Sequence, residues 1–439
     1  MNRTLILDCI EKTGEDVKIC GFVQTKRDHG KITFIDIVDR SGQIQVVLGG
    51  GKGAGLHPQD VVCITGKVNK RPENLVNKNI PTGEIEIYSE EIKVLSKAAE
   101  LPFDMGGKDL DLQLPTLLDY RSLTLRHPKI KDIFKVQSAI LEGFRKACLK
   151  RDCIEIIVPT IAASSTEGGA EVFKVDYYGH KAFMTQSPQL YKQMLIPVFE
   201  RVFTIAHAYR AEPSVTTRHL SETTQMDCEF GFVDFQDLLN LLEEIAVEML
   251  TFVQEKYPHI LEEFKVSKLA TGKIPRLRLR EAQEIIFKEF KRDNRKEKDL
   301  TPQDEVDICK WALEKHNSDF VTITHFPMMA KPFYTHPDPQ DPQYSLSYDL
   351  LFRGTEILSG SQRINDFEML AQSIQKRGMD PKDFEMYLQA FKYGMPPEGG
   401  FSYGMERLTK LLLGLENIRE ASLYPRDMER VDVRLSKKE

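Results

Sequence analysis

Residues 399–414 read GGFSYGMERLTKLLLG, and this stretch says most about the architecture. A glycine-rich, strand-like segment runs directly into an amphipathic helix whose first turn contains Arg407. Helix N-terminal amides favour an anion, and a guanidinium beside them binds phosphate oxygens. A single glycine-rich turn with an arginine is weak evidence, so its meaning depends on the rest of the chain.

A second polar stretch has the pattern of a hairpin lined with cations. Arg210 and Glu212 end one predicted strand, residues 217–220 (TRHL) form a loop, and residues 227–229 (DCE) lie on the returning strand. Guanidinium groups bind phosphate oxygens in pairs, so this hairpin suits a polyphosphate. A solvated hairpin with ordinary ion pairs is the alternative interpretation of the same pattern.

A third stretch, residues 349–363 (DLLFRGTEILSGSQR), combines small residues with oxygen ligands. Small residues allow a backbone to approach a ligand closely. Glu356 and Ser359 offer the oxygen ligands that Mg²⁺ prefers while it also binds phosphates. Arg363 is a candidate partner for a carboxylate.

The length and composition restrict the class of protein. With 439 residues the chain is too long for one ordinary domain, and 41% apolar with 29% charged residues is typical of a soluble globular protein. The net charge of −6 argues mildly against nucleic-acid binding but leaves room for a local basic face. No apolar run is long enough for a membrane, and no secretory signal is visible, so we expect a cytoplasmic protein. The seven scattered cysteines predict reduced thiols.

The chain divides into regions of different periodicity. Residues 17–95 contain five alternating segments separated by turn signals, which favours a five-stranded OB-fold barrel over another small β-domain. From residue 128 onward, helical patterns mix with largely antiparallel strand candidates, so the overall class is α+β. We expect an OB-fold domain at 1–100, a linker or hinge at 101–127 and a second domain at 128–439, with a small helical insertion at about 237–318.

Taken together, these stretches resemble the signature motifs of class II aminoacyl-tRNA synthetases. The predicted helix at 129–151 and the predicted strand at 153–159 (CIEIIVP), which ends at Pro159, resemble motif 1. Residues 210–229 resemble motif 2, and residues 399–414 resemble motif 3. The resemblance narrows to the aspartyl subgroup of archaeal/eukaryotic type. It rests on residues 164–173 (SSTEGGAEVF, a flipping loop), 186–193 (QSPQLYKQ) and 354–363 (GTEILSGSQR, the amino-acid pocket), and 423–427 (LYPRD).

This resemblance implies an antiparallel catalytic sheet flanked by helices, a homodimer, and ATP-dependent aspartylation of tRNA(Asp) through aspartyl-adenylate, with Mg²⁺ as cofactor. It assigns the catalytic cations to Arg210 and Arg407 and the metal to Glu356 and Ser359. The ATP site would comprise Arg210, Glu212 at the adenine, Arg218 and His219 at the γ-phosphate, Leu220, Glu356, Gly404, Met405, Glu406 and Arg407. Glu167 would bind the ammonium group of L-aspartate. The other aspartate-binding residues would be Gln189, Lys192, Arg210, Ser359 and Arg363.

The amino-acid pocket also separates the aspartyl enzymes from their asparaginyl relatives, which remain an alternative. Asparaginyl enzymes typically lack the lysine that stands here as Lys192. An amide needs no second cation, and two unpaired buried cations would reject it. One position departs from the aspartyl pattern: Thr223 stands where many members have a phenylalanine stacked on adenine, so that part of the ATP site is in question.

In the barrel, Phe34 is expected to stack on an anticodon base, with Arg27 and Gln45 near enough to contact base edges. A barrel-core position is the alternative for Phe34. Strictly aspartate-specific members have a Trp on the first barrel strand and a Lys in the loop before the last strand, where Gln24 and Pro81 stand here. We therefore expect relaxed charging of both tRNA(Asp) and tRNA(Asn), unless other loop residues restore the discrimination.

Three further alternatives remain open at this stage: an enzyme strictly specific for tRNA(Asp), a paralogue that activates or amidates a substrate without tRNA, and an RNA-binding module with an inactive catalytic domain. The retained barrel argues against the paralogue, and the nearly complete set of ATP-binding residues argues against the inactive module.

Overall fold

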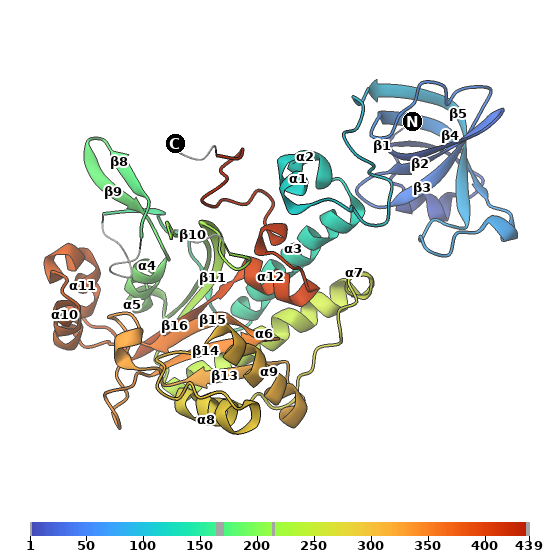
Figure 1. Cartoon of the computed structure of the whole chain (residues 1–439). Helices are drawn as coiled ribbons and strands as arrows, with labels where there is room; N and C mark the ends of the chain where they lie inside the picture. Colours follow the sequence, from blue (N-terminus) through green and yellow to red (C-terminus); the bar gives the residue numbers. More distant parts are fainter. Residues whose placement is uncertain (1, 164–170, 213–215, 436–439) are drawn as a thin grey trace. The chain divides into compact units, whose positions relative to one another are not determined.

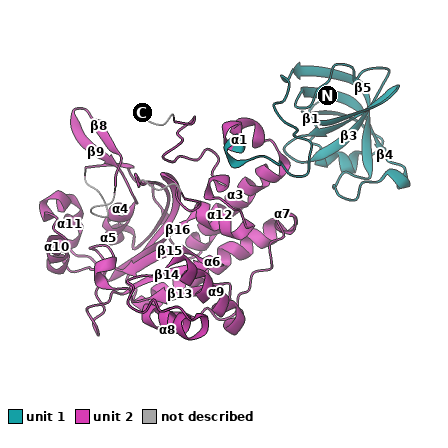
Figure 2. Cartoon of the chain, in the orientation of Figure 1, with its two compact units in different colours: residues 1–117 teal, residues 118–439 magenta. Residues whose placement is uncertain are grey.

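A computed structural model describes residues 2–163, 171–212 and 216–435 of the chain. The chain forms two compact units, Met1–Leu117 and Leu118–Glu439 (Figure 2). We describe each unit by itself.

The first unit is a closed five-stranded β-barrel, which confirms the predicted OB-fold. Its strands are β1 (Asp16–His29), β2 (Ile32–Val38), β3 (Gln43–Gly49), β4 (Val61–Lys70) and β5 (Ile85–Ser96), in the order β1-β2-β3-β5-β4 (Figure 1). Two short 3-10 helices, η1 (Leu7–Lys12) and η2 (Glu73–Leu75), accompany them. Alternating apolar residues such as Ile35, Ile37 and Val46 are fully buried inside the barrel, so the alternation seen in the sequence reflects its two faces.

The barrel holds a disulfide between Cys20 and Cys63, and the expectation that all seven cysteines are reduced is wrong for this pair. The two cysteines stand directly opposite each other on the antiparallel strands β1 and β4, with their Cα atoms 4.1 Å apart. Their separation of 43 residues hid this proximity from an analysis of local spacing. The remaining cysteines are buried free thiols: Cys9, Cys148, Cys153, Cys228 and Cys309.

The predicted linker contains two short helices, α1 (Leu114–Asp119) and α2 (Arg121–Thr124). Arg121 is buried and donates hydrogen bonds to the backbone carbonyls of Leu423, Glu420 and Ser422. The start of the second unit is therefore fixed to its C-terminal region.

An eight-stranded sheet forms the centre of the second unit (Figure 1). Its strands are, in spatial order, β12 (Arg276–Arg278), β13 (Phe320–Thr324), β14 (Ser347–Phe352), β15 (Thr355–Gln362), β16 (Glu398–Gly404), β11 (Glu222–Gly231), β10 (Arg201–Tyr209) and β6 (Ile154–Glu155). The neighbours are antiparallel except for the outermost pairs, β12–β13 and β10–β6, which are parallel. A separate three-stranded sheet contains β7 (Ile161–Ala162), β8 (Lys174–Tyr177) and β9 (His180–Met184).

The long helices α3 (Pro128–Leu149) and α6 (Phe235–Lys256) pack together on the sheet with α12 (Met405–Leu413). Their shared core includes Phe144, whose ring lies 5.8 Å from that of Phe203, and Tyr403, which donates a hydrogen bond to the Leu242 carbonyl at 2.6 Å. The other helices are α4 (Gln189–Met194), α5 (Ile196–Phe199), α7 (Pro258–Glu263), α8 (Leu279–Phe290), α9 (Pro302–His316), α10 (Phe367–Lys376), α11 (Glu385–Lys392), η3 (Met328–Ala330), η4 (Pro381–Phe384) and η5 (Ile418–Ala421). None of the described helices is both long and apolar enough to cross a lipid bilayer.

The segment predicted as a strand at 153–159 pairs with the sheet only over Ile154–Glu155. After this short strand, Ile157 is 98% exposed. Ile154 in the strand and Leu149 at the end of α3 are also exposed. Apolar side chains are therefore presented to solvent where motif 1 was predicted.

Candidate active site

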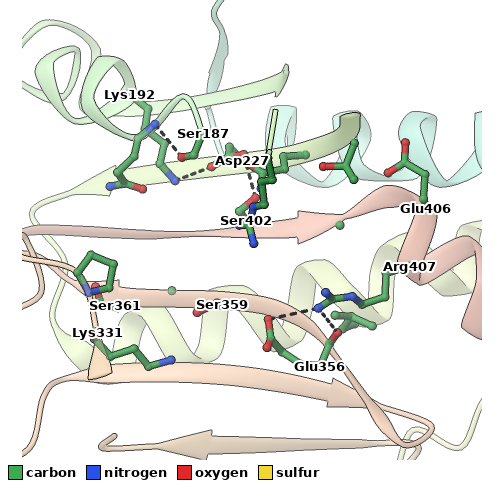
Figure 3. A pocket seen from close by; sticks show the side chains of 18 of the residues that line it. Ser187, Lys192, Asp227, Lys331, Glu356, Ser359, Ser361, Ser402, Glu406 and Arg407 are labelled. Atoms are coloured by element: carbon green, nitrogen blue, oxygen red, sulfur yellow. Dashed lines mark hydrogen bonds and ion pairs between the residues drawn. The ribbon is translucent and has the colours of Figure 1, made fainter. Parts of the chain in front are cut away.

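The three central strands β15, β16 and β11 form the floor of a cavity of about 380 Å³ (Figure 3). The floor is tightly packed around Gly400. A Cβ atom on Gly400 would lie 2.1 Å from the Cys228 carbonyl oxygen and 2.2 Å from Glu229 Oε2. A glycine at position 400 is therefore needed for the close approach of β11 and β16, whereas the sequence showed only that this segment is rich in glycine.

Most of the predicted site residues line this one cavity, although they come from distant parts of the sequence. They are Gln189, Lys192, Arg210, Arg218, His219, Leu220, Glu356, Ser359, Arg363, Gly404, Glu406 and Arg407. Glu212 and Met405 do not belong to the lining, and Met405 is buried as the first residue of α12. Glu167 lies outside the described residues.

One end of the cavity contains a buried ring of charges. Lys192 donates a hydrogen bond from Nζ to Asp227 Oδ1 at 2.8 Å (Figure 3). The same Nζ lies 3.0 Å from Glu229 Oε2. Arg363 donates from Nε to Glu229 Oε1 at 2.7 Å and from Nη2 to Gln189 Oε1 at 3.3 Å. Two cations and two carboxylates therefore meet in a site closed to bulk solvent.

The ring holds its charges despite burial. Burial opposes the charge on Lys192, but Asp227 and Glu229 outweigh it and raise the pKa of Lys192. Burial likewise opposes ionisation of Glu229, but Arg363 and Lys192 lower its pKa below the ordinary value. Both cations therefore stay charged at this end of the cavity, beside two ionised carboxylates.

The other end of the cavity is lined by Arg210, Arg218, His219 and Arg407. Arg407 donates from Nη1 to the Glu356 carbonyl at 2.9 Å and lies 3.6 Å from the Glu356 carboxylate (Figure 3). Arg218 Nη1 lies 3.4 Å from Glu305 Oε2. Burial and the neighbouring arginines lower the pKa of His219, although Glu212 acts in the opposite direction. Three cations at one end of a cavity suit a chain of phosphates.

The donor set near Glu356 fits a hard divalent cation. Ser359 pairs with Asp349 across β14 and β15, and its side chain lies in the cavity beside Glu356. Burial and the like charge of Asp349 raise the pKa of Glu356, and a bound cation would reverse that penalty. Among the described residues, no three His, Cys, Asp or Glu side chains form a cage of their own. A metal here would therefore take further oxygen ligands from a substrate, as Mg²⁺ does with phosphates.

Several residues in or beside the cavity had no role in the sequence analysis. Asp227 accepts hydrogen bonds from Lys192 and from Ser402 Oγ at 2.9 Å, and Lys331 donates to both carboxylate oxygens of Asp349 at 2.9 Å. The alternation of Asp227 and Glu229 on one strand was the available signal, since residues two apart share a face. Nothing in the local sequence marked Lys331 or Glu305 as part of the site.

Thr223, the position that departs from the aspartyl pattern, lines the cavity and provides no aromatic ring. The next residue, Thr224, donates its backbone N–H to both carboxylate oxygens of Glu406, at 3.1 and 3.0 Å. Burial raises the pKa of Glu406 to about 7. Glu406 therefore ties the start of α12 to strand β11 at this end of the cavity.

In the barrel, the three predicted anticodon contacts lie on neighbouring strands. Phe34 is half-buried and pairs with Arg27 across β1 and β2, while its fully buried neighbour Ile35 points inward. Arg27 donates from Nη2 to Gln45 Oε1 at 3.1 Å. The alternative position of Phe34 in the barrel core is therefore excluded, and the three side chains share the outer face of the sheet.

The two residues proposed for tRNA discrimination lie in different environments. Gln24 is buried at an irregularity of β1 and donates from Nε2 to the Met105 carbonyl at 3.2 Å. Pro81 is exposed in the loop between β4 and β5. The Gln24 side chain is therefore already hydrogen-bonded within the first unit, and Pro81 has no backbone N–H to donate.

Comparison with known proteins gives a family match for each of the two units. Residues 113–428 match the family of class II tRNA synthetases (D, K and N), and residues 17–95 match the OB-fold nucleic acid binding domain. An aspartate–tRNA(Asp/Asn) ligase of Thermus thermophilus is 39% identical over 435 residues, with 98% of this chain and 99% of that protein covered. An aspartate–tRNA(Asp) ligase of Pyrococcus abyssi is 37% identical, covering 96% of this chain and 97% of its own.

Among solved structures, asparaginyl-tRNA synthetase from Pyrococcus horikoshii complexed with asparaginyl-adenylate matches with a TM-score of 0.89 and 30% identity. The match covers 98% of this chain and 99% of that one. The chain belongs to the class II aminoacyl-tRNA synthetases, in the group that includes the enzymes for aspartate, lysine and asparagine. Within this group its function is aspartyl-tRNA synthesis, a ligase reaction with ATP, aspartate and tRNA as substrates.

Proposed function

We propose that the buried charge ring binds the side-chain carboxylate of L-aspartate, and that Lys192 and Arg363 are its anchors. The observation that supports this assignment is the presence of two charged cations at one closed end of the cavity. An amide in the same place carries no charge and would gain less from these two cations than a carboxylate does. Gln189 and Ser359 complete this part of the pocket, and Glu167 binds the ammonium group.

The reaction needs positioning more than covalent chemistry from the protein. In the first step the α-carboxylate of aspartate attacks the α-phosphorus of ATP, and pyrophosphate leaves; in the second step a terminal ribose hydroxyl of the tRNA takes the aspartyl group. Arg210 orients the α-carboxylate and the α-phosphate, while Arg218, His219 and Arg407 hold the γ-phosphate. Negative charge that develops on phosphate is stabilised by these groups in place, without a protein nucleophile.

The remaining ATP contacts follow the same arrangement. Glu212 accepts from the adenine amino group, and Leu220, Gly404, Met405 and Glu406 enclose the nucleotide. Glu356 and Ser359 would hold Mg²⁺, which when bound would neutralise part of the charge on the phosphates.

Exchange of labelled pyrophosphate into ATP tests the amino-acid assignment. We expect exchange that depends on aspartate and on Mg²⁺. Exchange with asparagine and none with aspartate would overturn the assignment in favour of an asparaginyl enzyme.

We further propose that the anticodon is bound on the outer face of the barrel by Arg27, Phe34 and Gln45, and that tRNA choice is relaxed. The anticodons GUC and GUU differ only in the third base, so selectivity needs a contact that penalises uracil. Gln24 is engaged with Met105 and Pro81 has no backbone donor, so neither provides that penalty. The Thermus thermophilus relative is named as a ligase for both tRNA(Asp) and tRNA(Asn), which agrees with this proposal.

Charging of purified tRNA(Asp) and tRNA(Asn) transcripts with aspartate measures the choice directly. We expect comparable kcat/KM for the two. A preference for tRNA(Asp) of about a hundredfold or more, equivalent to ~3 kcal/mol, would show that the enzyme is strictly specific and would contradict relaxed tRNA choice.

We also propose that the enzyme acts as a homodimer in the cytoplasm. The exposed apolar side chains of Leu149, Ile154 and Ile157, at the end of α3 and after it, support a self-association surface there. The domain assignment that accompanies the proposal is an anticodon-binding domain at 1–100, a hinge at 101–127 and a catalytic domain at 128–439.

A further inference from the structure

Glu398 is an acidic residue in a place that leaves little room for another negative charge. It is the first residue of β16, is fully buried and lies next to the charge ring. Its Oε1 accepts a hydrogen bond from Gln193 Nε2 at 2.7 Å, whereas Oε2 receives no hydrogen bond from any described residue. Glu398 and Glu229 lie on the same face of the neighbouring strands β16 and β11, because Glu398 pairs with Gly231 and Glu229 pairs with Gly400. Two carboxyl groups can share a hydrogen bond only when one of them holds the proton.

Gln193 fixes which oxygen holds that proton. The carbonyl oxygen of Gln193 already accepts hydrogen bonds from Tyr387 Oη at 3.0 Å and from Gln189 Nε2 at 2.9 Å. Its amide nitrogen is therefore the atom that faces Glu398, and Glu398 Oε1 must act as an acceptor. The proton is left on Oε2, where it can be donated to Glu229.

The charges in the ring balance only when Glu398 is neutral. Lys192 and Arg363 supply two positive charges, and Asp227 and Glu229 supply two negative charges. An ionised Glu398 would add a third negative charge with no cation of its own, at the end of the cavity where a carboxylate has to bind. Burial and Glu229 raise the pKa of Glu398 well above the ordinary value, although Arg363 acts in the opposite direction. Five groups face Glu398: Glu229 from β11, Arg363 directly after β15, Gln193 from α4, Tyr387 from α11 and Tyr348 from β14.

We propose that Glu398 is a positioning residue of the amino-acid pocket: as a neutral carboxylic acid it donates a hydrogen bond from Oε2 to Glu229 and holds that carboxylate against Arg363 and Lys192. The proposal rests on the proposed aspartate pocket. It assigns Glu398 no contact with the substrate, and it predicts an effect on aspartate binding that ATP binding does not share.

Two variants of Glu398 separate this role from a merely structural one. Glu398→Ala removes the donor to Glu229, and we expect the KM for aspartate to rise about tenfold or more while the KM for ATP changes less than about twofold. Glu398→Gln has the same shape, accepts from Gln193 and donates an amide hydrogen to Glu229, so it should restore most of the aspartate affinity. Glu385→Ala, on the exposed face of α11, is the matched control. If Glu398→Gln is as impaired as Glu398→Ala, Glu398 acts as an anion and the proposal is wrong.

An infrared difference spectrum of the full-length enzyme tests the proton itself, with no need for Glu398→Ala to fold. Subtracting the Glu398→Gln spectrum from that of the unmodified enzyme at neutral pH should leave the carbonyl stretch of a protonated carboxylic acid. A carboxylate band in its place would overturn the proposal. The band does not depend on which amino acid is activated. Failure of the aspartate assignment would therefore appear in the exchange assay, and failure of the neutral carboxyl would appear here.

Discussion

Arg363 and Glu229 form a buried pair in which Arg363 Nε lies 2.7 Å from Glu229 Oε1, and neither side chain has more than a few per cent of its surface exposed. Arg363 is therefore already neutralised before a substrate arrives. Aspartate binding has to add a carboxylate to a set of charges that is complete, so the second cation, Lys192, is needed to keep the new charge stabilised.

Replacing Arg363 with leucine should abolish aspartate activation while ATP binding persists. The variant leaves Glu229 with Lys192 as its only close cation, and breaking a buried pair costs ~3–5 kcal/mol. Isothermal titration with ATP and with aspartate, together with pyrophosphate exchange, measures the two effects separately. Arg276→Leu, which breaks the partly exposed pair with Glu243, is the control for loss of an arginine. Near-normal exchange by Arg363→Leu would show that Arg363 is not the side-chain anchor.

Glu305 predicts a pH dependence of ATP binding. Burial and the nearby Glu356 raise its pKa to about 7, although Arg218 and Arg407 lower it. Below pH 7 Glu305 is mostly neutral, and above pH 7 it is ionised and competes with phosphate for Arg218. The KM for ATP should therefore rise about threefold from pH 6 to pH 8, since a partly exposed ion pair is worth at most ~1 kcal/mol.

Glu305→Gln should remove the part of the rise in the KM for ATP that comes from ionisation of Glu305. Glu406, whose pKa is also about 7, titrates in both proteins, so the difference between the two pH profiles isolates Glu305. Glu314→Gln, at an exposed position of the same helix, serves as the control. Parallel profiles for Glu305→Gln and the unmodified enzyme would exclude competition for Arg218.

The Cys20–Cys63 bond predicts that the barrel loses stability in a reducing buffer. Closing a loop of 43 residues restricts the unfolded chain and contributes ~4 kcal/mol in the chain-entropy description. Thiol titration of the denatured, unreduced protein should find the five free cysteines. Cys20→Ser with Cys63→Ser should melt at a lower temperature and should no longer respond to reductant, whereas a count of seven thiols in the unreduced protein would contradict the bond.

Ile157 offers a test of the dimer. Its apolar side chain is 98% exposed, so an aspartate in this position costs little in an isolated chain but would be expensive inside a self-association surface. Light scattering at micromolar concentration should show a dimer for the unmodified enzyme and a monomer for Ile157→Asp. A monomeric and fully active unmodified enzyme would count against the dimer.

The parts of the fold that depend on local patterns were predictable from the sequence. The five barrel strands alternate between apolar and polar residues, and α3 and α6 have clear helical periodicity, so their positions agree closely with the structure. The strand predicted at 153–159 was too long because its apolar residues do not pair with the sheet, and apolar composition alone cannot distinguish burial from an exposed surface.

Features that join distant segments were harder to predict. The disulfide depends on the register of two strands, and nothing in the local sequence around Glu398 marked it as part of the site. Its importance depends on Glu229 and Gln193, which lie 169 and 205 residues earlier in the chain, respectively, at positions that only the folded sheet brings together.

The hydrogen bond from Gln24 to the Met105 carbonyl limits how tRNA selectivity could evolve in this chain. Met105 is itself buried, so a tryptophan at position 24 would both remove the amide donor and collide with the segment that now packs there. The first mutation towards a stricter enzyme would therefore disturb the barrel before it gained a contact with the anticodon. Selectivity would then require a compensating change near Met105 first, so the order of the substitutions matters.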